Sequence, residues 1–151
     1  MDVLFCDNCK KNQHFIVIDK KETFTIMNEQ ITIDTQVATC SSCNNELFYE
    51  PLDSQTILKA YNQYREKHGL LMPNEVKYIR EMYGLDQEAF SRITGIDIIS
   101  IERGSVQTEV EDRLLVLLND VRVMQLFIQE YDHKIDPKDK KILNLKLKKC
   151  K

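Results

Sequence analysis

The stretches that decide the fold read Cys6-Asp7-Asn8-Cys9 and Cys40-Ser41-Ser42-Cys43, and thirty residues separate them. Each is a Cys-x-x-Cys pair in a polar, turn-prone context. A spacer of two residues lets both sulfurs of a pair reach one metal ion, and two such pairs are typical of a tetrahedral Cys₄ zinc site. A redox Cys-x-x-Cys normally occurs once and beside a βαβ pattern, which this sequence lacks. We therefore predict that Cys6, Cys9, Cys40 and Cys43 bind one structural Zn²⁺.

The sequence between the cysteine pairs is rich in β-branched and aromatic residues at alternating positions. Runs over residues 14–18, 22–27 and 30–37 predict half-buried strands, with turns at Asp19-Lys20-Lys21 and Met27-Asn28-Glu29. A meander closed by zinc is a zinc-ribbon-like module, and its core is too small to fold without the metal. We expect His14 on a strand face or the surface rather than among the zinc ligands.

The rest of the chain reads as helices. After a linker helix, four short helices follow, with Asp86 and Asp97 as caps and Thr94-Gly95 as the turn between the second and the third. This is the helix-turn-helix pattern. The fourth helix begins at Thr108 or Glu109 and either runs on to Tyr131 or breaks near Asn119-Asp120.

The predicted fold class is therefore α+β, with a small zinc-ribbon-like N-terminal β domain followed by an all-α helix-turn-helix domain. Its expected parts are a Cys₄ zinc-binding β domain (residues 1–51), a linker helix (52–72), the helix-turn-helix domain (73–120), and a C-terminal helix with a basic tail (121–151).

Composition places the chain among ordinary globular proteins. Hydrophobic residues make up 42% of it and charged residues 30%. No apolar run has the length of a membrane-spanning helix, and the N-terminus does not read as a signal peptide. We therefore expect a cytoplasmic protein whose cysteines meet a reducing environment, which favours metal binding over disulfides. Cys150 has no partner in the sequence and reads as a free thiol.

Charge is unevenly distributed along the chain. Residues 73–120 carry 5 basic and 10 acidic groups, whereas residues 121–151 carry 9 basic and 4 acidic groups. The basic tail has three interpretations: a flexible end, a segment that adds affinity for phosphate, or a partner-binding helix. The apolar stretch from Leu114 to Phe127 favours packing against a second copy in a homodimer.

The cysteine pairs occur in one chain with the signposts Gln87-Glu88 and Glu102-Arg103-Gly104. This combination, over roughly residues 4–120, resembles the two-domain zinc-finger and helix-turn-helix proteins of the MqsA type, also called the YgiT-type zinc finger family. The N-terminal module is also similar to the one that precedes the SocA-type antitoxin domain. Antitoxins of bacterial toxin–antitoxin systems belong to this family.

The resemblance implies a zinc-binding N-terminal domain that docks a toxin. It also implies a Cro/lambda-repressor-like C-terminal domain that dimerises and represses its own promoter. Carried over, the recognition element is residues 96–103, and Gln87 matches a position that contacts phosphate. The candidate DNA-binding residues are Gln87, Arg92, Asp97, Ile98, Ser100 and Arg103.

Two departures weigh against DNA binding. The turn and third helix are nearly one helical turn shorter than in the family. Residues 96–102 also contain no Arg, Lys, Asn or Gln, the side chains that most often read base edges.

The sequence is therefore compatible with three functions. The first is a transcriptional regulator, acting as an antitoxin or as a phage or mobile-element repressor that binds an operator as a dimer. The second is a protein-interaction module with a degenerate helix-turn-helix that binds a toxin or another protein without DNA. The third, a zinc enzyme, is disfavoured because four cysteinates leave no coordination position for water.

Overall fold

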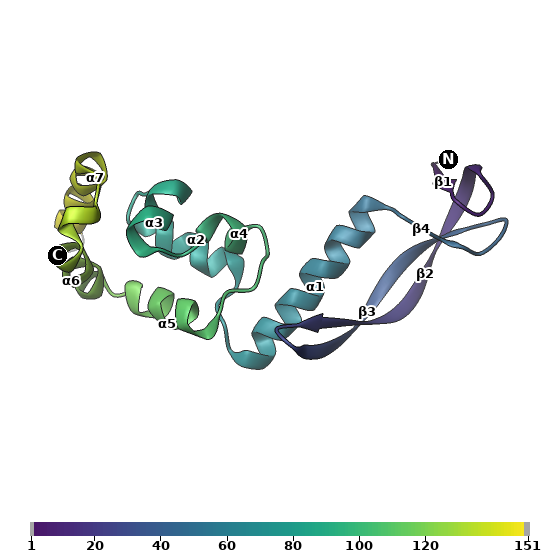
Figure 1. Cartoon of the computed structure of the whole chain (residues 1–151), viewed down its shortest axis with the longest axis horizontal. Coiled ribbons are helices and arrows are strands. Elements are labelled where there is room, and N and C mark those ends of the chain that lie inside the picture. Colours follow the sequence, from purple (N-terminus) through teal and green to yellow (C-terminus); the bar gives the residue numbers. More distant parts are fainter. Residues whose placement is uncertain (1, 150–151) are drawn as a thin grey trace. The chain divides into compact units, whose positions relative to one another are not determined.

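The computed structural model describes residues 2–149, and the chain divides into two compact units, Met1–Lys67 and His68–Lys151. An antiparallel sheet lies in the first unit, and the second is helical (Figure 1). The predicted α+β fold class is confirmed. Within residues 2–149, no helix has both the length and the apolar character needed to cross a membrane.

The sheet has the strand order β1 (Val3–Cys6), β2 (Lys11–Ile26), β3 (Glu29–Cys40) and β4 (Glu46–Leu47). All neighbouring strands are antiparallel. The long hairpin of β2 and β3 dominates the unit (Figure 1). Its turn is Met27-Asn28, where φ is 49° and 65°, as a two-residue type I′ turn requires.

The turn predicted at Asp19-Lys20-Lys21 is wrong, because β2 is continuous through these residues. Asp19 pairs with Gln36, and Lys21 pairs with Asp34, in the β2–β3 register. The Lys21 ammonium lies 2.7 Å from the Asp34 carboxylate, and the Gln36 amide donates to Asp19 at 3.0 Å. A charged stretch that resembles a turn in sequence is therefore a solvent-facing strand with cross-strand partners.

Helix α1 (Glu50–His68) runs along β3 and belongs to the first unit, whereas the sequence predicted a linker helix over residues 52–72. The hydroxyls of Thr56 and Thr35 form a buried hydrogen bond. Gln63 and Lys59 donate to the carbonyls of Thr32 and Asp34 at 3.1 and 2.5 Å. These bonds occupy carbonyl groups that no neighbouring strand takes up.

The second unit is built from short helices, each bounded by its own signals. Asp86, Asp97, Thr108 and Asp120 each accept a hydrogen bond from a backbone N–H in the first turn of a helix. The break predicted near Asn119-Asp120 is therefore the alternative that the structure adopts. The helices are α2 (Pro73–Met82), α3 (Gln87–Thr94), α4 (Ile98–Glu102), α5 (Glu109–Leu118), α6 (Val121–Glu130), the 3₁₀ turn η1 (Asp132–Lys134) and α7 (Pro137–Lys149).

One hydrophobic core joins these helices. Val76, Phe90, Ile98, Leu115 and Met124 are fully buried within it. Leu143 and Leu147 of α7 belong to the same core. The C-terminal stretch is therefore a packed helix up to Lys149; Cys150 lies outside the described residues.

Candidate metal centre and helix-turn-helix

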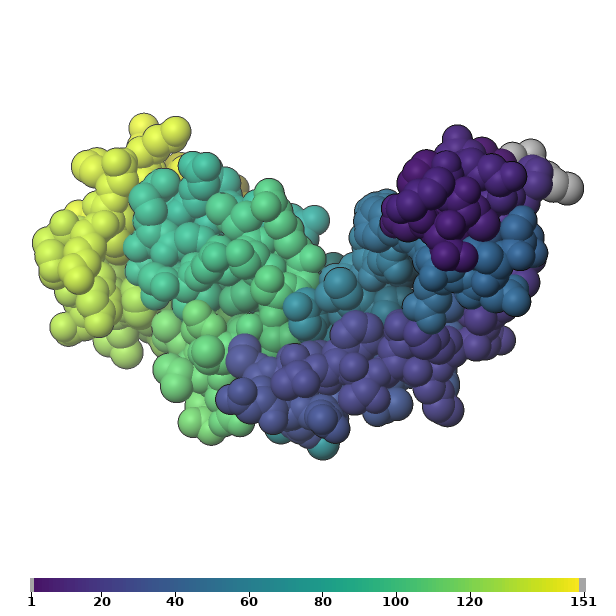
Figure 2. Space-filling view, turned by 45° about the vertical axis from the view of Figure 1, so that its right-hand side comes forward, coloured from purple at the N-terminus to yellow at the C-terminus, as the bar shows by residue number. Residues whose placement is uncertain are grey.

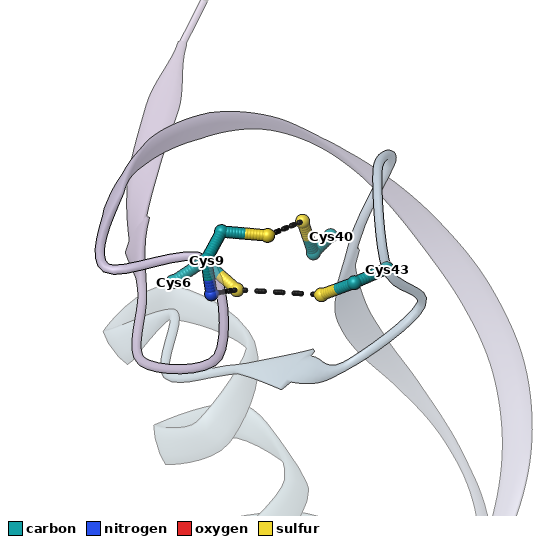
Figure 3. Close-up of side chains that lie close together, drawn as sticks. All are labelled: Cys6, Cys9, Cys40 and Cys43. Atoms are coloured by element: carbon teal, nitrogen blue, oxygen red, sulfur yellow. Dashed lines mark hydrogen bonds between the residues drawn. The ribbon is translucent and has the colours of Figure 1, made fainter.

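The four predicted zinc ligands come together at one end of the β2–β3 hairpin. Cys6 ends β1 and Cys40 ends β3, while Cys9 and Cys43 lie in the turns that follow. The sulfurs point toward one another (Figure 3). The Cys6 and Cys43 sulfurs lie 3.5 Å apart, and those of Cys9 and Cys40 lie 3.9 Å apart. All four ligand atoms are within 4.8 Å of one another.

These distances fit a metal ion rather than disulfides. A tetrahedral ion with metal–sulfur bonds of about 2.3 Å places its sulfurs about 3.8 Å apart, whereas a disulfide requires about 2.05 Å. The donor set is four soft thiolates, which is typical of structural zinc. Cys6, Cys9, Cys40 and Cys43 could therefore hold a metal ion such as Zn²⁺.

Local backbone geometry makes the two turns alike. The residue after each second cysteine, Lys10 or Asn44, is left-handed, with φ of 54° and 58°. The Cys9 N–H donates to the Cys6 sulfur, and the Ser42 N–H donates to the Cys40 sulfur, each at 3.4 Å. Such N–H groups stabilise thiolate charge, so both turns are prepared for a cation.

The thiols differ in acidity. The pKa of Cys43 is lowered to about 6, first by a hydrogen bond with the Asn8 side chain and then by one with the Asn45 backbone. The pKa of Cys9 is raised to about 12, first by its hydrogen bond with Cys43 and then by burial. Cys43 is therefore the thiol of this pair that ionises first.

A very small apolar cluster surrounds the cysteines. Ala38 and Leu47 are buried beside Cys6 and Cys40, with Phe15 and Tyr49 packed against them. The Phe15 and Tyr49 rings lie 5.2 Å apart between centroids. So few apolar residues cannot replace a metal, which is why a bound ion would supply much of the stability here. His14 is an exposed residue of β2 and is not part of the cysteine cluster.

In the second unit, α3, a turn and α4 form the predicted helix-turn-helix. Gly95 ends α3 in the left-handed conformation, with φ of 76°. Asp97 caps α4 by accepting from the Ser100 N–H at 3.1 Å. The Ile98 N–H donates to the Ser91 hydroxyl at 3.2 Å and so ties the start of α4 to α3.

The structure places the candidate DNA contact Gln87 against Glu102, to which its amide donates at 2.7 Å. Glu102 also receives a bidentate ion pair from Arg80 of α2. Burial raises the pKa of Glu102, but the hydrogen bonds from Arg80 and Gln87 lower it by more, so this carboxylate is held ionised. The role of Arg80 could not be predicted from the sequence, because its partner Glu102 lies two helices further along the chain.

Arg92 is also engaged within the unit. Its guanidinium donates to the Asp139 carboxylate of α7 at 3.1 Å. Asp139 is almost fully buried, while Arg92 keeps over half of its side chain exposed. Arg92 therefore connects α3 to α7.

The remaining candidates lie on or beside α4. Ile98 is fully buried in the core, which corrects its prediction as a DNA contact. The Ser100 hydroxyl donates to the Asp97 carboxylate at 2.6 Å. Arg103 follows α4 and is exposed. Of the predicted DNA-binding residues, Arg103 and Asp97 are the most exposed beside α4.

No family model, curated protein or solved structure matches the chain.

Proposed function

We propose that the protein is a zinc-containing transcriptional regulator that binds operator DNA as a dimer. In this proposal it acts in the cytoplasm as an antitoxin or as a phage or mobile-element repressor. The observation that carries the proposal is the arrangement of α3, the Gly95 turn and α4 on a core shared with α2 and α5.

The order within this segment supports the proposal. The N-caps of α3 and α4 and the hydrogen bond from the Ile98 N–H to Ser91 fix the position of α4 relative to α3. The buried Arg80–Glu102 pair fixes the end of α4 to α2. A helix that reads a DNA groove must be held rigidly by its neighbours, and these contacts meet that requirement.

The metal has a structural role in this proposal. Cys6, Cys9, Cys40 and Cys43 would hold Zn²⁺ in a closed site, and the bound ion would supply folding free energy rather than chemistry.

Apolar residues on α5 and α6 support a dimer. Val110, Leu117 and Leu126 are 73%, 56% and 62% exposed. Val110 and Leu117 lie seven residues apart and so share one face of α5, and an exposed apolar helix face is typical of an association surface.

A protein-interaction module that uses no DNA is the second candidate, and a specific observation favours it. The Gln87 and Arg92 side chains donate hydrogen bonds to carboxylates of the same unit, and α4 is only five residues long. The partner would be a toxin or another protein.

A salt-dependent gel shift tests the proposal. The zinc-loaded full chain is titrated into duplex DNA from its own promoter region and into a scrambled duplex of equal length. The proposal expects a shift selective for the promoter duplex. An intact dimer that shows no selective shift at low salt removes the proposal. In that case, a pull-down in which the chain binds the protein encoded by the adjacent reading frame supports the second candidate.

A further inference from the structure

Helix α7 is a built part of the second unit rather than a loose tail. Leu143 and Leu147 are buried in the common core. Asp139 is buried and bonded to Arg92 of α3. The side chain of Lys146 lies over Gly84, so closely that a Cβ there would meet the Lys146 Cε at 2.8 Å. Figure 2 shows the yellow surface of the C-terminal helices adjoining the teal surface of α3.

The face of α7 opposite these contacts is lysine-rich. At about 100° per residue, Lys138, Lys141, Lys148 and Lys149 fall on one side of the helix and Asp139, Leu143 and Leu147 on the other. All four lysines are exposed. Among residues 2–149, none of the four has a carboxylate partner. Their charge is therefore available to a ligand.

Nearby acidic groups do not cancel this charge. Asp139 is paired with Arg92, and Asp132 with Lys140. Asp136 accepts from the backbone N–H of Lys138 at the start of the helix. By contrast, α4 contains no cation at all from Ile98 to Glu102. Apart from Arg103, which follows α4, the helix expected to enter a groove offers no cation, whereas α7 carries four exposed lysines on one face.

We propose that the lysine face of α7 binds the phosphate backbone of DNA and supplies the phosphate contacts that α4 lacks. This inference rests on the proposed function. From Lys138 to Lys149 the face spans about 16 Å, over which one DNA strand presents about five phosphates. A membrane surface is a poorer fit, because a helix that binds lipid turns an apolar face outward, whereas Leu143 and Leu147 face the core and Leu145 is the single large apolar residue exposed on this helix within residues 2–149.

Salt dependence of DNA binding distinguishes this face from the rest of the molecule. The test compares the zinc-loaded full chain with K141Q/K148Q and with the control K11Q/K21Q, which removes the same charge from strand β2. Each lost phosphate contact lowers the magnitude of the slope of log K against log salt by about 0.9. The α7 variant should therefore lose nearly two from the slope, on promoter and scrambled duplexes alike. The control should keep the wild-type slope, and K141R/K148R should restore it.

Each outcome decides between the two proposals. Equal slopes for wild type and K141Q/K148Q overturn the inference and leave the proposed function standing. A wild-type chain that binds neither duplex removes both. Binding of polyglutamate without binding of DNA also overturns the inference, because it assigns the face to an acidic protein. Circular dichroism melts of all variants verify that the exposed substitutions leave the fold intact.

Discussion

Arg80 of α2 forms a bidentate ion pair with the carboxylate of Glu102 of α4. Its Nε lies 2.6 Å from Oε1, and its Nη2 lies 3.1 Å from Oε2. The side chains are only 10% and 6% exposed. Arg80 also donates to the Leu85 carbonyl at 2.8 Å, so one guanidinium connects α2, the turn before α3, and α4.

Removing one partner of this pair should destabilise the second unit strongly. We expect Arg80→Ala to lower the free energy of unfolding by about 3 kcal/mol, because it leaves the buried Glu102 charge with the neutral Gln87 amide but without its ion-pair partner. Denaturant unfolding followed by helical circular dichroism measures the change. The matched control is Arg122→Ala, which breaks an ion pair whose arginine is 86% exposed and should cost under about 1 kcal/mol. Equal losses in the two variants would contradict this account.

The same carboxylate should make stability depend on pH. The pKa of Glu102 is lowered in the folded chain, as burial is outweighed by Arg80 and Gln87, so its contribution is fully present above the ordinary value of 4.5. That contribution is lost as the pH falls through the folded pKa. The gap in unfolding free energy between wild type and Glu102→Gln should therefore be constant above about pH 6 and shrink below the ordinary pKa. A gap that widens in acid would contradict the sign.

Metal removal should unfold the first unit selectively. Chelation, or Cys43→Ser, takes away a contribution on the order of 10 kcal/mol from a unit with a very small core around the site. The expected result is loss of the β signal with the helical signal of the second unit retained. Metal analysis should find one ion per chain in the wild type and in the control Cys150→Ser. A strand signal that survives complete metal removal would show that the sheet folds alone.

The hairpin turn offers a stabilising substitution. Met27 adopts φ of 49°, which costs an L-residue about 1–2 kcal/mol. Replacing Met27-Asn28 with Asn-Gly supplies the residues that a type I′ turn prefers, so the metal-loaded unit should gain about 1 kcal/mol. Thermal melting measures the gain. Thr25→Gly is the control, since glycine inside the strand should destabilise by about 0.5–1 kcal/mol.

Signals that lie within a few residues of each other were readable from the sequence. The Cys-x-x-Cys pairs predicted the sulfur cluster. Asp86 and Asp97 predicted where α3 and α4 begin, and Gly95 predicted where α3 ends. Helix caps and metal-binding turns depend only on residues that are close in the sequence. The continuity of β2 was not readable, since the charges at Asp19 and Lys21 only make sense beside β3.

Whether a predicted DNA-binding residue is free or hydrogen-bonded within the fold depends on partners that lie far away in the sequence. Gln87 bonds to a residue 15 positions away, and Arg92 to one 47 positions away. No periodicity or motif encodes such pairings. The family pattern therefore suggested free side chains at Gln87 and Arg92, whereas both donate hydrogen bonds within the unit. The packing of α7 was missed for the same reason: its lysines mark a solvated end in sequence, while Leu143 and Leu147 reach a core built by earlier helices.

The turn of the β2–β3 hairpin and the cysteine cluster lie at opposite ends of it. Pairing runs from Ile26 with Glu29 beside the turn to Phe15 with Cys40 at the far end. Cys40 therefore reaches the first cysteine pair only when the strands are paired along their whole length. A hairpin paired only near Met27-Asn28 leaves the two cysteine pairs apart, and a metal ion then has two ligands instead of four. A bound ion thus favours the fully paired hairpin over every partly paired one.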